Sequence, residues 1–186
     1  MNRRQFLTLS GAAAGWTLLS GHSPYRQWIV YRETHLVIIT SRDDPAGDDL
    51  GETFAAVLRQ ALPDSKAAVG RGPRVQRIAS LLVSKQAEVG VVSCVNGLAM
   101  YRGDGPFAQY GQVPLRVLVQ NEQYQLVCRE DFLPQHGYLV AEALMENGGK
   151  ERGLFIPAAG GSGAIPPHAG ALAFAQGLPL ETQERR

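Results

Sequence analysis

The segment "AEVGVVSCVNGLAMYRGDGPF", Ala87 to Phe107, joins a strand pattern directly to a helix pattern. Val89 to Val92 form a short continuous apolar run, which is typical of a strand buried on both faces. Val95 to Tyr101 follow at once, and this segment favours a short helix. The polar residues between the two patterns therefore fall at the carboxyl end of a predicted strand.

Two similar units precede this segment. Leu36 to Thr40 predict a buried strand, and apolar residues recur at helical spacing from Leu50 to Leu62, where Pro63 ends the pattern. Ala67 to Val69 predict a second strand, and Val75 to Leu82 a second amphipathic helix. Strands that alternate with helices indicate parallel strands joined by right-handed crossovers.

The remaining elements follow the central segment. Leu115 to Val119 and Tyr124 to Cys128 predict two more strands, Tyr138 to Glu146 a late helix, and Ala171 to Gln176 a short one. We therefore expect an α/β fold with a mostly parallel sheet flanked by helices. Residues 35–180 form one domain in this interpretation, and residues 181–186 form a polar tail.

The N-terminus has the pattern of an export signal. Arg3 and Arg4 precede Phe6 and Leu7, and an apolar run of about 13 residues extends from Leu7 to Leu19. Spanning a bilayer takes roughly 20 residues, so the run is short for a membrane helix. We expect residues 1–21 to be a twin-arginine signal and residues 22–34 a linker. The sequence therefore predicts a periplasmic protein, either released or tethered to the inner membrane by an uncleaved signal.

Composition argues against several classes of function. The formal net charge is +1, so no basic surface argues for nucleic-acid binding. The four histidines show no metal-ligand spacing, and the chain has no Gly-x-Ser-x-Gly elbow and no phosphate loop. We expect no enzymatic activity, no metal and no cofactor. Cys94 and Cys128 are compatible with one disulfide in an oxidising compartment.

Three loops share one edge of the predicted sheet. Ligands of open α/β sheets bind beyond the carboxyl ends of the strands, where residues 41–49, 70–74 and 93–96 are expected. The candidate ligand-binding residues are Ser41, Arg42, Arg71, Gly72, Arg74, Ser93, Cys94 and Asn96. Several of these residues also have explanations that involve no ligand. The arginines could be solvated surface residues, Ser93 could be a turn residue at the end of a strand, and Cys94 could be an unreactive thiol. N-capping and the helix dipole explain Asp48 and Asp49 well, because both precede a predicted helix.

Four motifs resemble the first lobe of the TAXI-family solute receptors of TRAP transporters. The central segment ends in Tyr-x-Gly-x-Gly-Pro-Phe (Tyr101 to Phe107), and "VPLRVLVQNEQYQLVCRED" (residues 113–131) follows it. "HGYLVAEALMEN" (residues 136–147) is similar to the late helix of the family. "IPPHAGALAF" (residues 165–174) is similar to its C-terminal segment, which here includes His168. The resemblance implies one lobe of a type II periplasmic-binding-protein-like fold.

The sequence departs from that family in two respects. Only about seven residues separate Cys128–Asp131 from Tyr138, where the family inserts a second lobe. The ligand loops also differ: an acidic loop replaces the Gly-Thr-Gly-Gly-type segment, and Arg71 to Arg74 replace Thr-Gly-Gly-Ser. We therefore expect a solute-binding-like protein that binds a small polar or anionic solute on one lobe. The alternative is a non-catalytic accessory protein that docks on a transporter or another periplasmic protein.

The missing lobe also predicts an interaction surface. Strands and apolar faces that would meet the hinge have lost their cover in this interpretation, and such surfaces often mark interfaces. We expect a homodimer contact or a protein partner near Tyr124 and Phe132.

Overall fold

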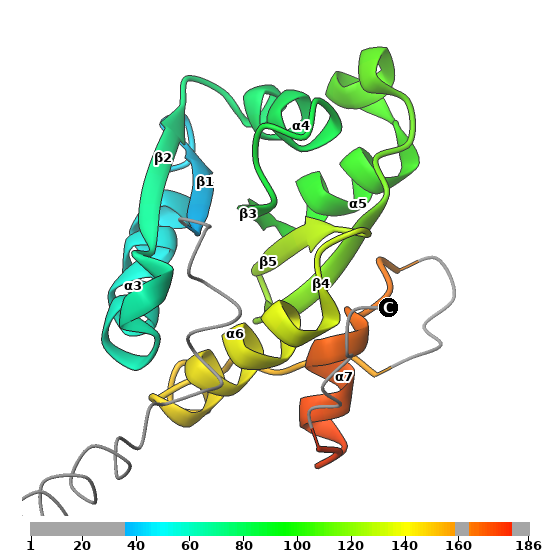
Figure 1. Ribbon diagram of the computed structural model, residues 1–186. Coiled ribbons are helices and arrows are strands. Elements are labelled where there is room, and N and C mark those ends of the chain that lie inside the picture. The colour runs from blue at the N-terminus through cyan, green and yellow to red at the C-terminus, as the bar shows by residue number, and fades with distance from the viewer. Residues whose placement is uncertain (1–35, 159–163, 180–186) are drawn as a thin grey trace, which may run out of the picture.

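The computed structural model describes residues 36–158 and 164–179 (Figure 1). The predicted export signal (1–21), linker (22–34) and polar tail (181–186) lie outside the described residues. The elements, in chain order, are β1 (Val37–Ser41), α3 (Pro45–Ala61), η1 (Pro63–Ser65), β2 (Ala68–Gly72), α4 (Val75–Val83), β3 (Val89–Ser93), α5 (Cys94–Arg102), η2 (Gly105–Tyr110), β4 (Leu115–Gln120), β5 (Tyr124–Arg129), α6 (Pro134–Glu146) and α7 (Ala169–Ala175).

The described strands form one five-stranded sheet in the order β2-β1-β3-β5-β4. β1 pairs in parallel with β2 on one side and with β3 on the other, as the alternating sequence pattern predicts. β5 pairs antiparallel with both β3 and β4. β4 therefore runs in the same direction as β3, and β5 is inserted between them in the opposite direction.

The prediction of a mostly parallel sheet is corrected by this pairing: the α/β class is confirmed, but the sheet is mixed. The physical reason is the connection between β4 and β5, which contains only residues 121–123. A parallel connection needs a crossover of a dozen or more residues, whereas a hairpin needs two to five. Asn121 shapes this turn, because its Oδ1 accepts hydrogen bonds from the backbone nitrogens of Gln123 (2.9 Å) and Tyr124 (2.7 Å).

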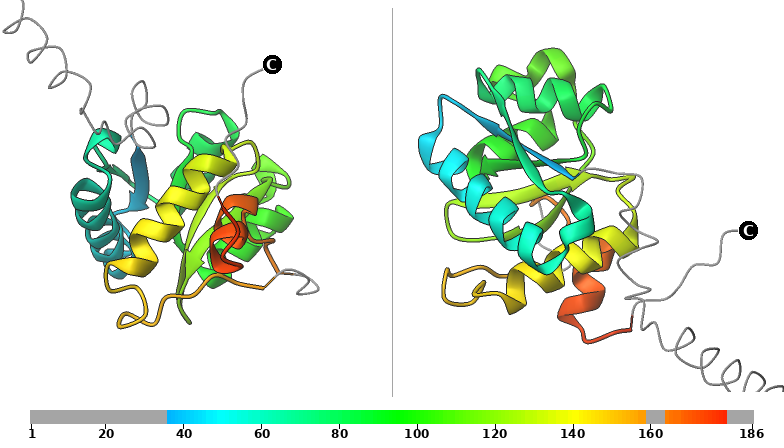
Figure 2. Two further views of the ribbon diagram at one scale, coloured as in Figure 1. Left: turned by 60° about the horizontal axis from the view of Figure 1, so that its bottom comes forward. Right: turned by 60° about the vertical axis from the view of Figure 1, so that its left-hand side comes forward.

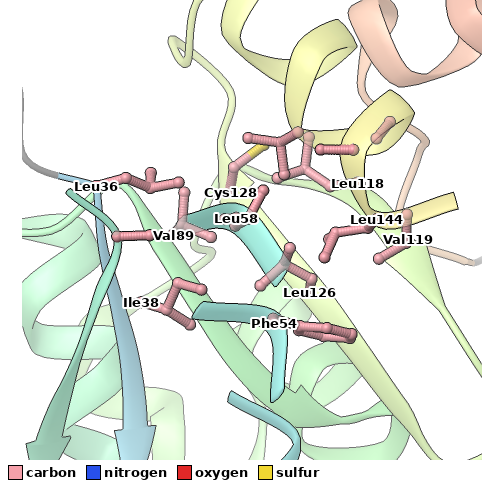
Figure 3. Close-up of a cluster of buried hydrophobic side chains, with 14 of the residues drawn as sticks. Leu36, Ile38, Phe54, Leu58, Val89, Leu118, Val119, Leu126, Cys128 and Leu144 are labelled. Carbon is pink, nitrogen blue, oxygen red and sulfur yellow. The ribbon is translucent and has the colours of Figure 1, made fainter. Parts of the chain in front are cut away.

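Helices cover both faces of the sheet (Figures 1 and 2). Ile38 and Ile39 are adjacent in β1 and therefore point to opposite faces. Ile38 belongs to a buried cluster with Phe54 and Leu58 of α3 and with residues of α6, part of which Figure 3 shows. Ile39 belongs to a second buried cluster, with residues of α4, Met100 of α5 and Phe107 of η2. Two helical layers thus sandwich the sheet and bury most of β1, β3, β4 and β5, whereas the edge strand β2 is largely exposed or half-buried.

A β-bulge in β4 adjusts the packing on the α6 face. Val117 pairs with Val127 and Val119 pairs with Leu126, so Leu118 is the extra residue between two consecutive pairs. As a result Leu118 and Val119 both lie in the cluster beneath α3 and α6, while Val117 points to the opposite face. The bulge therefore lets the side chains of two consecutive residues pack into the same buried cluster.

The chain itself covers the outer edge of β4. The backbone nitrogen of Gln120 donates to the oxygen of Phe155, and the nitrogen of Phe155 donates back to Gln120. Nearer the start of β4, the backbone nitrogen of Val117 donates to the oxygen of Pro166, and the oxygen of Val117 accepts from the nitrogen of His168. An edge strand that is paired in this way has no free backbone groups for another chain at these positions.

This cover corrects the expectation of an open face near Phe132. Phe132 is 4% exposed, and its ring makes edge contacts with the rings of His136 and His168. α6 packs over the sheet with Leu139, Ala143 and Leu144 buried, and α7 packs on α6.

No helix in the described part of the chain is long and apolar enough to cross a bilayer.

Candidate binding site

The carboxyl ends of β1 and β3 form the switch point of the sheet. After β1 the chain enters α3 on one face and then reaches β2; after β2 it crosses through α4 on the other face and returns to β3, on the opposite side of β1. The loops after β1 and β3 therefore leave the sheet toward opposite faces. Such a point is where open α/β sheets bind ligands.

The two strands separate at this point. The ladder between β1 and β3 contains Ile38 with Val89 and Ile39 with Gly90. Thr40 and Ser41 continue to pair with β2, while the end of β3 pairs with β5 instead. The backbones of β1 and β3 are thus no longer joined at their carboxyl ends.

The predicted site residues lie at the carboxyl ends of three adjacent strands, β2, β1 and β3, and at the starts of the helices that follow β2 and β3. Ser41 ends β1, and the backbone nitrogen of Arg42 donates to the oxygen of Gly72 at the end of β2 (2.9 Å). Ser93 ends β3 and caps α5, because its Oγ accepts from the backbone nitrogen of Asn96 (3.3 Å). The remaining predicted residues occupy β2 and the starts of α4 and α5: Arg71, Arg74 and Cys94. The three loops therefore share the carboxyl edge, as the sequence predicts.

The side chains at this edge are largely paired with one another. Arg71 Nε donates to Oδ2 of Asp48 at 2.8 Å, and Arg71 Nη2 contacts Oε1 of Glu52 at 2.5 Å. Thr40 Oγ1 donates to Oδ1 of the same Asp48 at 2.6 Å. The hydrogen bonds from Arg71 and then from Thr40 hold the pKa of Asp48 below its usual range, and the charge of Arg42 adds a smaller effect. Arg71 is thus held by α3, whereas Arg42 and Arg74 are exposed.

Tyr124 links the two sides of the switch point. It begins β5, opposite Ser93, and its hydroxyl donates to Oδ1 of Asp44 at 2.6 Å. Asp44 is the N-cap of α3 and also accepts from the backbone nitrogen of Gly47 at 3.1 Å. The bond to this carboxylate, together with burial, raises the pKa of Tyr124 to about 12. A Cβ at Gly47 would lie 3.1 Å from the Tyr124 ring, so the glycine lets the ring approach the helix.

Sequence reasoning missed Thr40, Asp44 and Tyr124 as members of this site. Tyr124 had a usable signal, because a short connection makes β4 and β5 a hairpin and thereby brings the start of β5 to the carboxyl edge. Asp44 also had one, since an aspartate directly before a proline favours a helix N-terminus. Another buried polar group lies near the edge: Gln125 packs its amide against Gly97 of α5.

The two cysteines lie at opposite ends of the sheet. Cys94 begins α5 at the carboxyl edge, whereas Cys128 pairs with Val89 at the other end of β3. Both thiols are free, so the disulfide that the sequence left open is not formed. Burial raises the pKa of each thiol, so neither carries the low pKa of a reactive cysteine. Cys94 Sγ contacts the backbone oxygen of Asn121 at 3.8 Å.

Among the described residues, no group of three or more His, Cys, Asp or Glu side chains is placed to hold a metal ion. The geometry thus defines an α/β domain whose polar groups gather at a switch point. No protein-family model and no curated protein matches this sequence.

Proposed function

We propose that the protein is an exported binding protein that holds a small polar solute at the switch point between β1 and β3. The observation that carries this proposal is the separation of these two strands where the loops after β1, β2 and β3 meet. Backbone groups and polar side chains at such a point recognise ligands in many α/β proteins. The resemblance of four motifs to TAXI solute receptors supports the same function.

The charge at this edge constrains the solute. Asp48 and Glu52 already pair with Arg71, while Arg42 and Arg74 are exposed in the turns after β1 and β2. A polar solute that carries one anionic group could pair with Arg42 or Arg74 and leave the ion pairs of Arg71 with Asp48 and Glu52 intact. Amino acids and small organic acids are the classes that fit this arrangement.

Ligand-dependent melting tests the proposal. A solute at a hundredfold excess over its Kd raises stability by about 2.7 kcal/mol, which corresponds to roughly 5–10 °C for a domain of this size. Arg42→Ala with Arg74→Ala should abolish that shift. Arg152→Ala, at an exposed arginine after α6, should leave it unchanged. Absence of any shift across amino acids and organic acids would overturn the solute-binding function.

A second function is favoured by the internal pairing of the same side chains. Ser41 donates to Asp43, Arg71 is bound by two carboxylates, and Tyr124 is bound by Asp44. In a receptor without bound ligand, we would expect the polar side chains of the binding site to be free to bind the ligand. The pairing thus suits a non-catalytic accessory protein that docks on another exported protein. Crosslinking of the full chain in cells, with no solute effect on melting, would support this alternative.

Export itself rests on the paired arginines of the N-terminus. We expect Arg3→Lys with Arg4→Lys to leave the protein in the cytoplasm, because the twin-arginine route reads that pair. Fractionation of cells that express the wild type and the double variant measures this. Periplasmic accumulation of the double variant would contradict a twin-arginine signal.

A further inference from the structure

His168 joins three parts of the fold that are distant in the sequence. Its backbone nitrogen donates to the oxygen of Val117 in β4 at 2.8 Å. Its ring Nε2 lies 2.9 Å from the backbone oxygen of Phe132, 36 positions earlier, just before α6. Its ring Nδ1 accepts from the backbone nitrogen of Gly170 at 3.2 Å and caps α7. Through its backbone and its side chain, this one residue therefore connects α7 to β4 and to the start of α6.

These two ring contacts specify the protonation state. A backbone oxygen can only accept, so Nε2 must carry a hydrogen; a backbone N–H can only donate, so Nδ1 must have a free lone pair. Only the neutral imidazole with hydrogen on Nε2 satisfies both partners. A protonated ring would put two N–H groups, those of His168 Nδ1 and Gly170, against each other.

The packing around His168 leaves little room for the ring to move. His168 is 2% exposed. A Cβ at Gly137 of α6 would lie 2.0 Å from His168 Nδ1, and a Cβ at Gly170 would lie 1.9 Å from the oxygen of Pro134. The two glycines thus allow α6, α7 and the imidazole to pack in close contact, and a rotated ring would meet the α6 backbone.

The electrostatic surroundings also oppose a charged ring. Burial lowers the pKa of His168 from its ordinary value; the hydrogen bond to Phe132 counteracts this, and the positive charge of Arg116 in β4 adds to the lowering. Arg116 is in turn paired with Glu130. His136 of α6 contacts the ring of Phe132, which also contacts His168, and α7 contains no ionisable side chain.

We propose that His168 is a proton-sensitive clasp that holds the segment from Ile165 through α7 on β4 and α6. While the ring is neutral, it caps α7 and binds the oxygen of Phe132, which keeps the backbone of His168 in place beside Val117. When the ring gains a proton, the cap is lost and the positive charge moves to solvent, so α7 separates from α6. The release uncovers the outer edge of β4 near Val117 and the ring of Phe132. This inference is independent of any solute at the opposite edge.

The sign of the pH dependence follows from proton counting. The released state binds a proton at the ordinary pKa of histidine, about 6.5, while the closed state binds it only at lower pH. Opening is therefore independent of pH above about 6.5. Between that pH and the lower value of the closed state, the equilibrium constant for opening rises about tenfold for each pH unit.

Hydrogen exchange of the full chain, followed by mass spectrometry and corrected for the intrinsic pH dependence of exchange, tests the clasp. We expect peptides that contain α7 to lose protection progressively below pH 6.5, while peptides from β1 and β3 keep theirs. Nuclear magnetic resonance of the histidine ring nitrogens should show hydrogen on Nε2 of His168 at neutral pH. Hydrogen on Nδ1 instead, or α7 protection that does not change with pH, would overturn the proposal.

Two substitutions of His168 test whether the pH dependence of α7 exchange comes from this histidine or from a general loss of stability in acid. Asparagine is a good N-cap that does not titrate in this range, so His168→Asn keeps an acceptor for Gly170 and should make α7 exchange independent of pH. His168→Gln tests the same point with a side chain that reaches toward Phe132. His136→Gln is the matched control and should retain the wild-type pH dependence. Loss of that dependence in His136→Gln, with retention in both His168 variants, would assign the effect to the wrong histidine and refute the clasp.

Discussion

The hydroxyl of Tyr124 donates a 2.6 Å hydrogen bond to the carboxylate of Asp44, a residue 80 positions earlier in the chain. This bond joins the first residue of β5 to the N-cap of α3 across the ends of β1 and β3. One consequence is that the antiparallel hairpin and the parallel half of the sheet are connected at their shared carboxyl edge.

Tyr124→Phe should remove one partly buried hydrogen bond and lower the free energy of unfolding by about 1 kcal/mol, measured by urea denaturation. The bond also stabilises the protonated phenol, whose pKa is raised to about 12. This contribution is therefore complete below pH 10 and is lost as pH rises from 10 to 12. Absorbance titration should show one tyrosine near pH 12 in the wild type that is missing in Tyr124→Phe. Identical titration curves would contradict the Tyr124–Asp44 bond.

Ile38→Ala should be strongly destabilising, because Ile38 is fully buried in the cluster beneath α3 and α6. Truncation at such a site costs about 2–5 kcal/mol of unfolding free energy. Val95→Ala is the control: Val95 is 79% exposed, and its substitution should change the free energy of unfolding by less than about 0.5 kcal/mol. Equal effects of the two substitutions in denaturant titrations would show that β1 is not buried.

Gly97 and Gln125 should be energetically coupled. A Cβ at Gly97 would lie 1.7 Å from Nε2 of Gln125 and 3.1 Å from Cγ2 of Val92, so Gly97→Ala forces the amide to move. We expect this substitution to cost about 1–3 kcal/mol. Inside a helix alanine is preferred to glycine by about 1 kcal/mol, so the cost should largely disappear when Gln125→Ala is also present. A double-mutant cycle by thermal or urea unfolding measures the coupling, and additive effects would contradict the contact.

The two thiols should both be free but should differ in reactivity. Cys94 is half-buried at the carboxyl edge, whereas Cys128 is fully buried in the core. A thiol reagent should modify Cys94 slowly in the native protein, because burial raises its pKa, and should reach Cys128 only after unfolding. Mass spectrometry of the modified protein counts the thiols. A mass two hydrogens lower, with no modification after unfolding, would indicate a disulfide and contradict this arrangement.

Much of the fold is readable from apolar periodicity. The strands around Ile38 and Val91 lie where continuous apolar runs predict them, and the strand around Val117 lies where the sequence also predicts one. The helix starts were less accurate, since α3 and α6 begin at Pro45 and Pro134, before the first apolar residues of each pattern. Proline at a first helical turn is a start signal that depends on position rather than on hydropathy. The direction of β5 could be read only from the length of its connection to β4.

The candidate site was less predictable than the fold. The positions of its loops follow from the rule that loops after parallel strands share one edge, and that rule needs no side chains. The pairing of Arg71 with Asp48, 23 positions apart, depends instead on the rotation of α3 about its axis, which points the first turn of the helix toward β2. Spacing along the chain does not encode that rotation. For the same reason Arg71 looks like an anion receptor in the sequence but is bound by α3 in the structure.

The cover on β4 also sets an order of events during biosynthesis. The ribosome completes β4 at Gln120, but the residue that closes the far end of its edge, His168, is made 48 residues later. At about 5–20 residues per second, a nascent chain would carry an uncovered strand edge for roughly 2–10 s. A chain that terminates before Pro166 never acquires this cover, so premature termination should yield a product prone to strand-to-strand aggregation and in need of chaperone protection.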